Sequence, residues 1–255
     1  MGKYTRVFDT EQEYNTYMSG EPYIPNMSYI REIGKGGVRL TPISPTPQHD
    51  YVEIGGIKWA TMNIGATAVT DTGLYFQWGD ISGYTADQVG SGTGQKYFGW
   101  ADYKYGNGTS SPGATGMTKY NSTDGKTVLD LTDDGVNGYL GGQWRMPTTE
   151  EFQLLGEAVY AALTENYQGT GVAGLILFDK IDSSKQLFFP AAGYANDSLK
   201  NFGIGGYYWT SSLSNLGPTV GTSFRFINSS SVPSWVYTGN RFYGYPLRGV
   251  LDENS

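Results

Sequence analysis

The residue types that carry most enzyme chemistry are scarce in this chain of 255 residues, which has no cysteine and one histidine, His49. The lack of cysteine excludes disulfides, thiolate nucleophiles and cysteine-ligated metal sites. One histidine cannot supply a multi-histidine zinc or iron site, and a Ser–His–Asp triad would have to use this single residue. His49 lies beside a proline-rich stretch, where a surface or linker role is expected. We therefore expect no enzyme activity, no catalytic residue and no cofactor.

Neighbouring carboxylates could suggest acid–base chemistry, as at Glu150 and Glu151. Glu151 is better explained by a capping box with Thr148, in which each side chain bonds the other's backbone N–H at the start of a helix. The glycine-rich run at 90–94 (GSGTG) could suggest a phosphate loop. It does not join a strand to a helix, and no Gly-Lys-Ser/Thr follows it, so these glycines are assigned to a loop.

Residues 130–141 (DLTDDGVNGYLG) resemble the start of a calcium-binding loop, with Gly135 at the turn position. The segment lacks an acid at its third position and the bidentate glutamate at its twelfth. A structural calcium ion held by Asp130 and Asp134 remains open, but the pattern favours a turn with Asx hydrogen bonds. We assign no metal site on these residues.

The composition is that of a loop-rich protein whose loops are held by large rings. The chain has 37 glycines, 21 tyrosines and 6 tryptophans, and 16% of its residues are charged. The net charge is −7 and no basic run occurs, which argues against a nucleic-acid partner. No apolar stretch approaches the ~20 residues needed to cross a bilayer, so we expect no membrane insertion.

The organisation predicts two parts. Residues 1–50 include a capping-box pattern at 10–13, a short amphipathic helix ending at Gly20 and a stiff proline-rich linker at 42–47. A helix of about three turns does not fold alone, so this part is expected to attach or oligomerise. The remainder, 51–255, is predicted to be one domain.

The domain begins with a β-hairpin over 52–59, where apolar residues alternate on both sides of Gly55-Gly56. Residues 83–127 keep no period and are predicted to be an ordered but irregular insertion. A helix begins after Pro147, and its apolar face is predicted to carry Phe152, Leu155, Val159 and Leu163. Short strands are expected at 175–178, 186–189, 223–227 and 246–250. Few helices among many short strands give an α+β domain.

Four segments taken together resemble one family. They are 52–65 (VEIGGIKWATMNIG), 74–80 (LYFQWGD), 141–155 (GGQWRMPTTEEFQLL), and 207–212 with 244–250 (YYWTSS and GYPLRGV). The combination is similar to the major paralogous domain of the C-type-lectin-like group, which includes formylglycine-generating enzymes and phage tropism determinants. The resemblance implies a C-type-lectin-like fold with short antiparallel strands, one or two helices and long ordered loops.

The resemblance also bears on activity and source. Formylglycine generation depends on active-site cysteines, which this chain lacks. The calcium-dependent sugar signatures Glu-Pro-Asn and Trp-Asn-Asp are absent too, so the fold name does not imply sugar binding. Residues 8–30 (FDTEQEYNTYMSGEPYIPNMSYI) resemble leader segments of structural proteins from gut phages and prophages. Some members of the group are variable proteins of diversity-generating retroelements, which rewrite adenine-containing codons near the C-terminus.

The C-terminal stretch fits a displayed, changeable surface. Residues 198–251 contain no Asp or Glu and are rich in Ser, Asn, Tyr, Thr, Gly and Trp, as antibody loops are. Strand alternation assigns a core-facing set: Trp209, Phe224, Phe226, Leu247 and Val250. Arg248 is expected to hold a structural pair or a loop carbonyl.

The predicted ligand-binding residues could all arise from an Asn codon by changes at its adenines, except Trp235, which is either fixed or derived from a different codon. An ordinary set of polar loop residues is the alternative. The candidates are Leu213, Ser214, Asn215, Ser230, Ser231, Ser234, Trp235, Tyr237, Thr238, Asn240, Phe242, Tyr243 and Tyr245.

These observations predict a non-enzymatic receptor-binding protein of a phage tail, located in the virion and bound to other tail proteins. Its partner would be a bacterial surface receptor, protein or glycan. Several copies would strengthen a weak site, so we expect a homo-oligomer, with a trimer as one possibility. The N-terminus, MGKYTR, lacks a signal peptide's apolar core. That favours release in a virion over the alternative, an adhesin of the same fold on a bacterial cell surface.

Overall fold

The computed structural model describes backbone and side chains for residues 49–229 and 232–252, and the backbone of three strands before them. The chain divides into two units, Met1–His49 and Asp50–Ser255. In the first unit, β1 (Val7–Phe8), β2 (Tyr29–Gly34) and β3 (Gly37–Pro42) form an antiparallel sheet in the order β1-β3-β2. The helix predicted at 10–20 lies outside the described residues, as does the linker predicted at 42–47 apart from Pro42, which ends β3.

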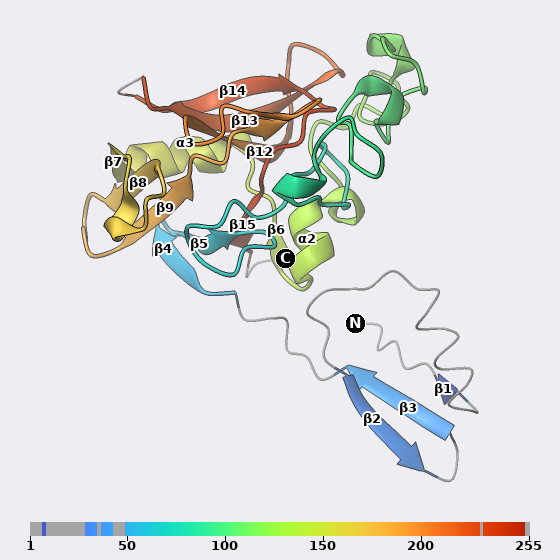
Figure 1. Cartoon of the computed structure of the whole chain (residues 1–255), viewed down its shortest axis with the longest axis horizontal. Coiled ribbons are helices and arrows are strands. Elements are labelled where there is room, and N and C mark those ends of the chain that lie inside the picture. Colours follow the sequence, from blue (N-terminus) through green and yellow to red (C-terminus); the bar gives the residue numbers. More distant parts are fainter. Residues whose placement is uncertain (1–6, 9–28, 35–36, 43–48, 230–231, 253–255) are drawn as a thin grey trace. The chain divides into compact units, whose positions relative to one another are not determined.

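The second unit contains four antiparallel sheets and two α-helices among the residues described (Figure 1). This is an α+β arrangement, as predicted. One sheet has β4 (Tyr51–Ile54), β5 (Ile57–Asn63), β15 (Arg248–Leu251) and β6 (Trp144–Arg145) in that order; the others are β7 (Val159–Thr164), β8 (Gly174–Asp179) and β9 (Gln186–Pro190); β10 (Tyr194–Ala195) and β11 (Leu199–Lys200); and β12 (Gly205–Leu213), β13 (Val220–Ile227) and β14 (Ser234–Asn240). The α-helices are α2 (Gly135–Leu140) and α3 (Thr149–Ala158).

The local turn and cap predictions are confirmed. Gly55 and Gly56, with φ of 62° and 76°, turn the chain between β4 and β5. At the start of α3, Thr148 accepts from the backbone of Glu151, whose carboxylate accepts from Thr148 N at 2.7 Å. Arg145 holds the same carboxylate with two hydrogen bonds of 2.7 and 2.8 Å. The helix therefore begins where its sequence predicts.

The predicted end of this helix is wrong. Phe152 and Leu155 are buried helix residues, but α3 ends at Ala158, and Val159 and Leu163 belong to β7. Val159 pairs with Asp179 and Leu163 with Leu175 of β8. Val159 is β-branched, which favours extended backbone, and β8 is present as a partner strand. Pairing with this distant strand overrides the helical period of the sequence here.

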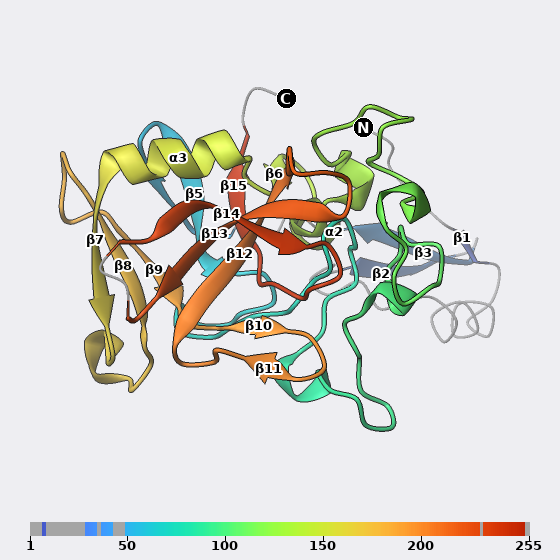
Figure 2. The ribbon, with the colours of Figure 1, turned by 90° about the horizontal axis from the view of Figure 1, so that it is seen from above.

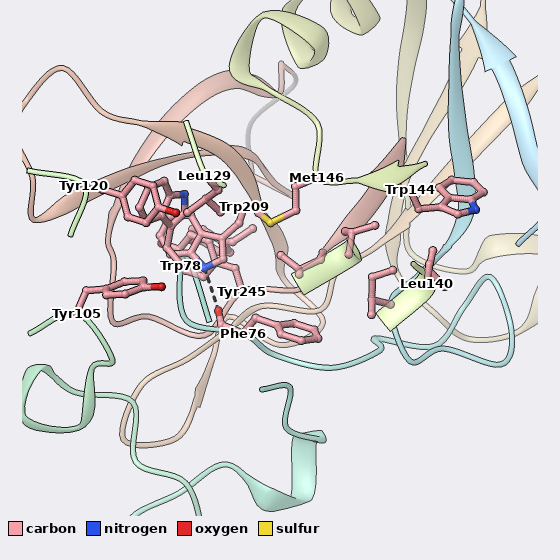
Figure 3. Close-up of a cluster of buried hydrophobic side chains, with 14 of the residues drawn as sticks. Phe76, Trp78, Tyr105, Tyr120, Leu129, Leu140, Trp144, Met146, Trp209 and Tyr245 are labelled. Atoms are coloured by element: carbon pink, nitrogen blue, oxygen red, sulfur yellow. Dashed lines mark hydrogen bonds between the residues drawn. The ribbon is translucent and has the colours of Figure 1, made fainter. Parts of the chain in front are cut away.

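Strand β12 separates two clusters of buried side chains. Tyr207 and Trp209 point into one cluster, which Figure 3 shows around Trp78 and Tyr245. Tyr208, between them, joins the second cluster with the buried rings of β13 and α3. Successive strand residues point to opposite faces, so one strand supports both cores. All five predicted core residues, Trp209, Phe224, Phe226, Leu247 and Val250, are at most 2% exposed.

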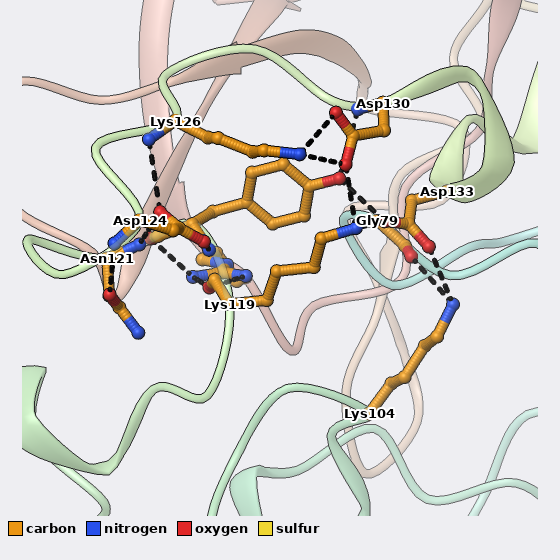
Figure 4. Close-up of polar contacts among 10 residues, drawn as sticks. Gly79, Lys104, Lys119, Asn121, Asp124, Lys126, Asp130 and Asp133 are labelled. Carbon is orange, nitrogen blue, oxygen red and sulfur yellow. Dashed lines mark hydrogen bonds and ion pairs between the residues drawn. The ribbon is translucent and has the colours of Figure 1, made fainter.

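Residues 83–127 are irregular, as predicted, and pack through short turns. They contain the 3-10 helices η1 (Ala86–Gln88), η2 (Trp100–Asp102) and η3 (Ala114–Gly116); η4 (Leu131–Asp133) and η5 (Tyr167–Gly169) lie elsewhere. Asp133 anchors this insertion (Figure 4): its carboxylate pairs with Lys104 at 3.2 Å and with Lys119, and accepts from Tyr120 Oη at 2.6 Å. A nearly buried carboxylate thus fixes a segment that has little regular structure.

The calcium-like segment is a set of turns. Asp130 pairs with Lys119 at 2.8 Å and Lys126 at 2.6 Å. Asp134 caps α2 by accepting backbone hydrogen bonds of 2.7–3.0 Å from Val136, Asn137 and Met146, which confirms the Asx interpretation. Burial raises the pKa of Asp134 to about 6. In the described part of the chain, no three His, Asp or Glu side chains gather as metal ligands.

Across the described residues, no helix is long and apolar enough to span a bilayer.

Replacing Asp133 by Asn is expected to lower the free energy of unfolding at pH 7 by about 3 kcal/mol, because two ammonium groups and a phenol lose their anionic partner. Denaturant unfolding measures the change. Asp102→Asn, at an exposed carboxylate, is the control and should change it by less than about 0.5 kcal/mol. Equal effects of the two substitutions would contradict the anchoring role.

The pH dependence of unfolding tests the same group. Desolvation opposes ionisation of Asp133, but hydrogen bonds from Lys119, Tyr105 and Tyr120 outweigh it and hold its pKa well below 3.8. Its contribution is therefore complete above pH 3.8 and is lost as the pH falls through the lower, folded-state value. Below pH 3.8 the wild type should lose stability more steeply than Asp133→Asn.

Candidate ligand-binding surface

Half-buried aromatic side chains line the outer rim of the first core cluster. Apart from Tyr139 of α2, they come from η2, from β10, from β14 and from the two residues after Arg241. Figure 2 shows the strands β10, β13 and β14 of this region. With one arginine of β13 the side chains from these segments form what we call the aromatic surface. Its members are Trp100, Tyr194, Arg225, Tyr237, Phe242 and Tyr243.

The rings of this surface touch one another. The centroid of Phe242 lies 4.8 Å from Trp100 and 4.5 Å from Tyr243, and Tyr243 lies 5.3 Å from Tyr194. Edge-to-face and tilted contacts at these distances fix ring orientation. The rings therefore form a rigid surface and are not separate mobile side chains.

Arg225 and Tyr237 continue the surface across the sheet. The buried ring of Tyr207 lies 4.9 Å from Tyr194 and 6.2 Å from Tyr237. The Arg225 guanidinium lies 4.4 Å from the Tyr237 ring centre and 5.5 Å from that of Tyr207. Such cation–π contacts hold the arginine against the sheet without neutralising its charge.

The tyrosine hydroxyls of this surface are available to a ligand. No hydrogen bond joins the hydroxyls of Tyr194, Tyr237 or Tyr243 to any of the described residues. By contrast, the buried hydroxyls of Tyr75 and Tyr208 each donate to a backbone carbonyl at 2.7 Å. Desolvation raises the pKa of Tyr194, so this phenol is protonated at neutral pH, as an unperturbed tyrosine also is. The surface thus offers ring faces and donors together.

The predicted ligand-binding residues divide by position. Tyr237, Phe242 and Tyr243 lie on the aromatic surface. Leu213 and Asn240 lie at one end of the same sheet, since Leu213 pairs with Gly221 and Asn240 with the adjacent Val220.

The hairpin between β12 and β13 carries two more predicted residues. Asn215 is exposed there, whereas Ser214 is buried, at 4% exposure. The Ser214 hydroxyl accepts from Leu216 N at 3.1 Å, so its role is to close the turn. The prediction that Ser214 is displayed is corrected.

A bulge sends part of β14 to the opposite face. The register with β13 shifts between the pairs Ser223–Tyr237 and Arg225–Ser234, which adds a residue to β14. Trp235 consequently stacks on Phe224, with centroids 5.0 Å apart, on the side covered by α3.

Other predicted residues do not belong to the group of touching rings. Thr238 pairs with Thr222, whose hydroxyl contacts Thr149 of α3, so Thr238 and Trp235 do not share the face of Tyr237. Ser234 lies at the far end of the sheet from Leu213. Ser230 and Ser231 lie outside the described residues.

Tyr245 is a core residue and its predicted display is corrected. It is 2% exposed and stacks on Trp209 with ring centroids 4.0 Å apart and planes at 20°. Gly239 makes room for it, because a Cβ there would lie 2.4 Å from Tyr245 Oη. Tyr245 supports the aromatic surface from beneath, 6.1 Å from Tyr243.

Sequence reasoning missed Trp100, Tyr194 and Arg225. Arg225 stands between two buried phenylalanines of a predicted strand, and alternation alone would have placed it on the opposite face from them. Trp100 and Tyr194 lie far from β14 in the sequence, and no local pattern connects them with it.

Arg241 fixes the end of β14 next to this surface. Its side chain is fully buried and donates to Tyr103 Oη at 2.7 Å and to the carbonyls of Lys119, Tyr120 and Pro218 at 2.6–3.3 Å. These carbonyls belong to the insertion and to the β12–β13 hairpin. One guanidinium therefore ties three segments together immediately before Phe242 and Tyr243.

Arg241→Lys is expected to lower the free energy of unfolding by about 3 kcal/mol, because an ammonium group cannot make the same set of hydrogen bonds from a buried site. Denaturant unfolding measures the loss, and amide hydrogen exchange should become faster at Phe242 and Tyr243. Arg225→Lys, in the same sheet, is the matched control, and should change stability by less than about 1 kcal/mol. If both substitutions cost the same, Arg241 does not have this special role.

Searches of protein-family models, of curated proteins and of solved structures give no match to this chain.

Proposed function

We propose that this chain is a non-enzymatic receptor-binding protein whose aromatic surface contacts the ligand. The observation that carries the proposal is the set of hydroxyls on Tyr194, Tyr237 and Tyr243, which are unbonded within the described structure while their rings are packed in place. Rings that are already ordered lose little entropy on binding, and free hydroxyls can adapt to a partner.

The composition around the surface supports the same function. No carboxylate occurs in 198–251, so a docking partner would not have to desolvate an acidic side chain of this segment. Aromatic anchors ringed by small polar residues are typical of binding hot spots. Asn215 and Asn240 supply such polar groups at the end of the sheet next to Leu213.

We further propose that the domain has the C-type-lectin-like fold and belongs to a phage tail. The resemblance of the four sequence segments supports the fold, and that of residues 8–30 supports a virion protein. Diversification of adenine-containing codons would alter Tyr237, Phe242 and Tyr243 while Tyr245 and Trp209 keep the core. Residues 1–50 would attach several copies of the chain to the particle, and the several copies would provide avidity.

The coding DNA tests the diversification. A nearby copy of the C-terminal coding segment that differs only at adenines would support it, and tail genes beside this gene would support the virion location. Envelope-assembly genes in their place would favour a cell-surface adhesin.

Tyr237→Ala is expected to weaken binding to receptor-bearing cells at least tenfold, because it removes an anchoring ring and its hydroxyl. The fluorescently labelled full chain is titrated against a panel of bacterial strains by flow cytometry, and the variant is compared on any strain that the wild type stains. Unfolding free energies, measured in parallel, exclude a folding defect.

Tyr160→Ala is the matched control, since Tyr160 is 66% exposed on β7, away from the aromatic surface. It should leave staining unchanged. Equal staining by wild type and Tyr237→Ala would contradict the proposed surface.

A further inference from the structure

Residues 198–251 contain three arginines, and one of them differs from the other two in its burial and its hydrogen bonds. Arg241 and Arg248 are fully buried, and each guanidinium donates to several backbone carbonyls. Arg225 is half-buried, and within residues 49–229 and 232–252 no hydrogen bond or ion pair to its guanidinium is found. Its Nε in particular is shielded from solvent and has no partner there.

The position of Arg225 is nevertheless fixed. Its guanidinium lies 4.4 Å and 5.5 Å from the ring centres of Tyr237 and Tyr207, and Arg225 pairs through its backbone with Tyr207 of β12 and Ser234 of β14. A guanidinium ordered in advance loses less entropy when it meets an anion. The two tyrosine rings thus fix the position of a guanidinium whose charge is not neutralised by the described residues.

A small pocket lies beside this arginine. It has a volume of about 180 Å³ and is lined by Arg225, Phe226, Ile227, Ser229, Val232 and Ser234. All six belong to the segment without carboxylates, so a bound anion would meet no like charge from the residues that line the pocket. The lining combines one cation, two hydroxyl-bearing residues and apolar walls.

We propose that this pocket binds a carboxylate group of the ligand, with Arg225 as its counter-charge. The inference rests on the proposed function, because it names the chemistry of a group that the aromatic surface would receive. A planar guanidinium can donate two parallel hydrogen bonds to a planar carboxylate. A single cation matches one negative charge, whereas phosphate sites in proteins commonly gather several cations or backbone N–H groups.

The test is a titration of the full chain, labelled with ¹⁵N, followed through the Arg225 Nε–Hε signal and the backbone amides of Ser229 and Ser234. Sodium acetate is the probe, at constant ionic strength kept with sodium chloride. Acetamide is the neutral control and sodium phosphate the competing oxyanion. We expect saturable shifts at millimolar acetate, none with acetamide and weaker ones with phosphate.

Substitutions assign the effect to the arginine. Arg225→Gln should abolish the acetate shifts of the Ser229 and Ser234 amides, and Arg225→Lys, which keeps the charge without the planar fork, should weaken them severalfold. Lys180→Gln removes a cation that lies 5.5 Å from the Tyr160 ring on another sheet, and should change nothing. Acetate shifts that survive Arg225→Gln would overturn the proposal.

Other results overturn it as clearly. Flat acetate titrations, or phosphate binding more tightly than acetate, would remove the carboxylate assignment. Where acetate does bind and Arg225→Gln abolishes the shifts, N-acetylglutamate and glucuronate distinguish the source of the carboxylate: tighter binding of the first indicates an acidic protein side chain, and tighter binding of the second a sugar acid.

The two proposals fail separately. If acetate does not bind while Tyr237→Ala still weakens staining of cells, the carboxylate pocket is wrong and the receptor-binding surface stands. If acetate binds while Tyr237→Ala leaves staining unchanged, the pocket is an anion site and the receptor-binding proposal is wrong.

Discussion

The buried guanidinium of Arg241 is the constraint on which the aromatic surface depends. Desolvation lowers its pKa below 12.5, and no carboxylate within the described residues pairs with it. Backbone carbonyl dipoles and the faces of aromatic rings stabilise the positive charge of Arg241 in place of a carboxylate. Its centre lies 4.7–5.8 Å from four rings, those of Trp78, Tyr103, Tyr105 and Tyr120. Because so many groups converge on one charge, the irregular insertion cannot move away from β14 without exposing all of them together.

The sheet beneath the aromatic surface is supported from both sides of one strand. Tyr207 and Trp209 belong to one core cluster and Tyr208 to the other, so β12 is held from both faces. Arg248 adds a second buried tie: it donates to the carbonyls of Ala60, Thr61 and Phe188 at 2.8–3.0 Å. These carbonyls belong to the strands β5 and β9, whereas a structural pair or a loop carbonyl was predicted. The support of the sheet therefore comes from buried residues and not from the residues at the rim, which is what the proposed diversification would require.

The sequence predicted correctly those features that depend on interactions between residues close together in the chain. The hairpin at Gly55-Gly56, the cap at Thr148 and the mixed α+β composition all follow from turn, capping and alternation rules, and the structure has them. Val159 was misplaced because its partner strand lies some twenty residues further on, beyond any helical period. Trp235 and Tyr245 were misplaced for a related reason: a one-residue bulge and a close approach at Gly239 decide which way they face, and neither leaves a mark in composition.

The three arginines of 198–251 differ in how the fold uses their hydrogen-bonding groups. Arg241 and Arg248 have their hydrogen-bonding capacity used by the protein itself, so replacing either leaves buried carbonyls without donors. The guanidinium of Arg225 has only ring contacts among the described residues. These contacts fix its orientation but do not neutralise its charge. Water solvates the guanidinium in the unfolded chain and still solvates its exposed part in the folded chain. The charge of Arg225 therefore adds little to the free energy of unfolding. Under the carboxylate proposal, an anion of the partner would pair with this guanidinium.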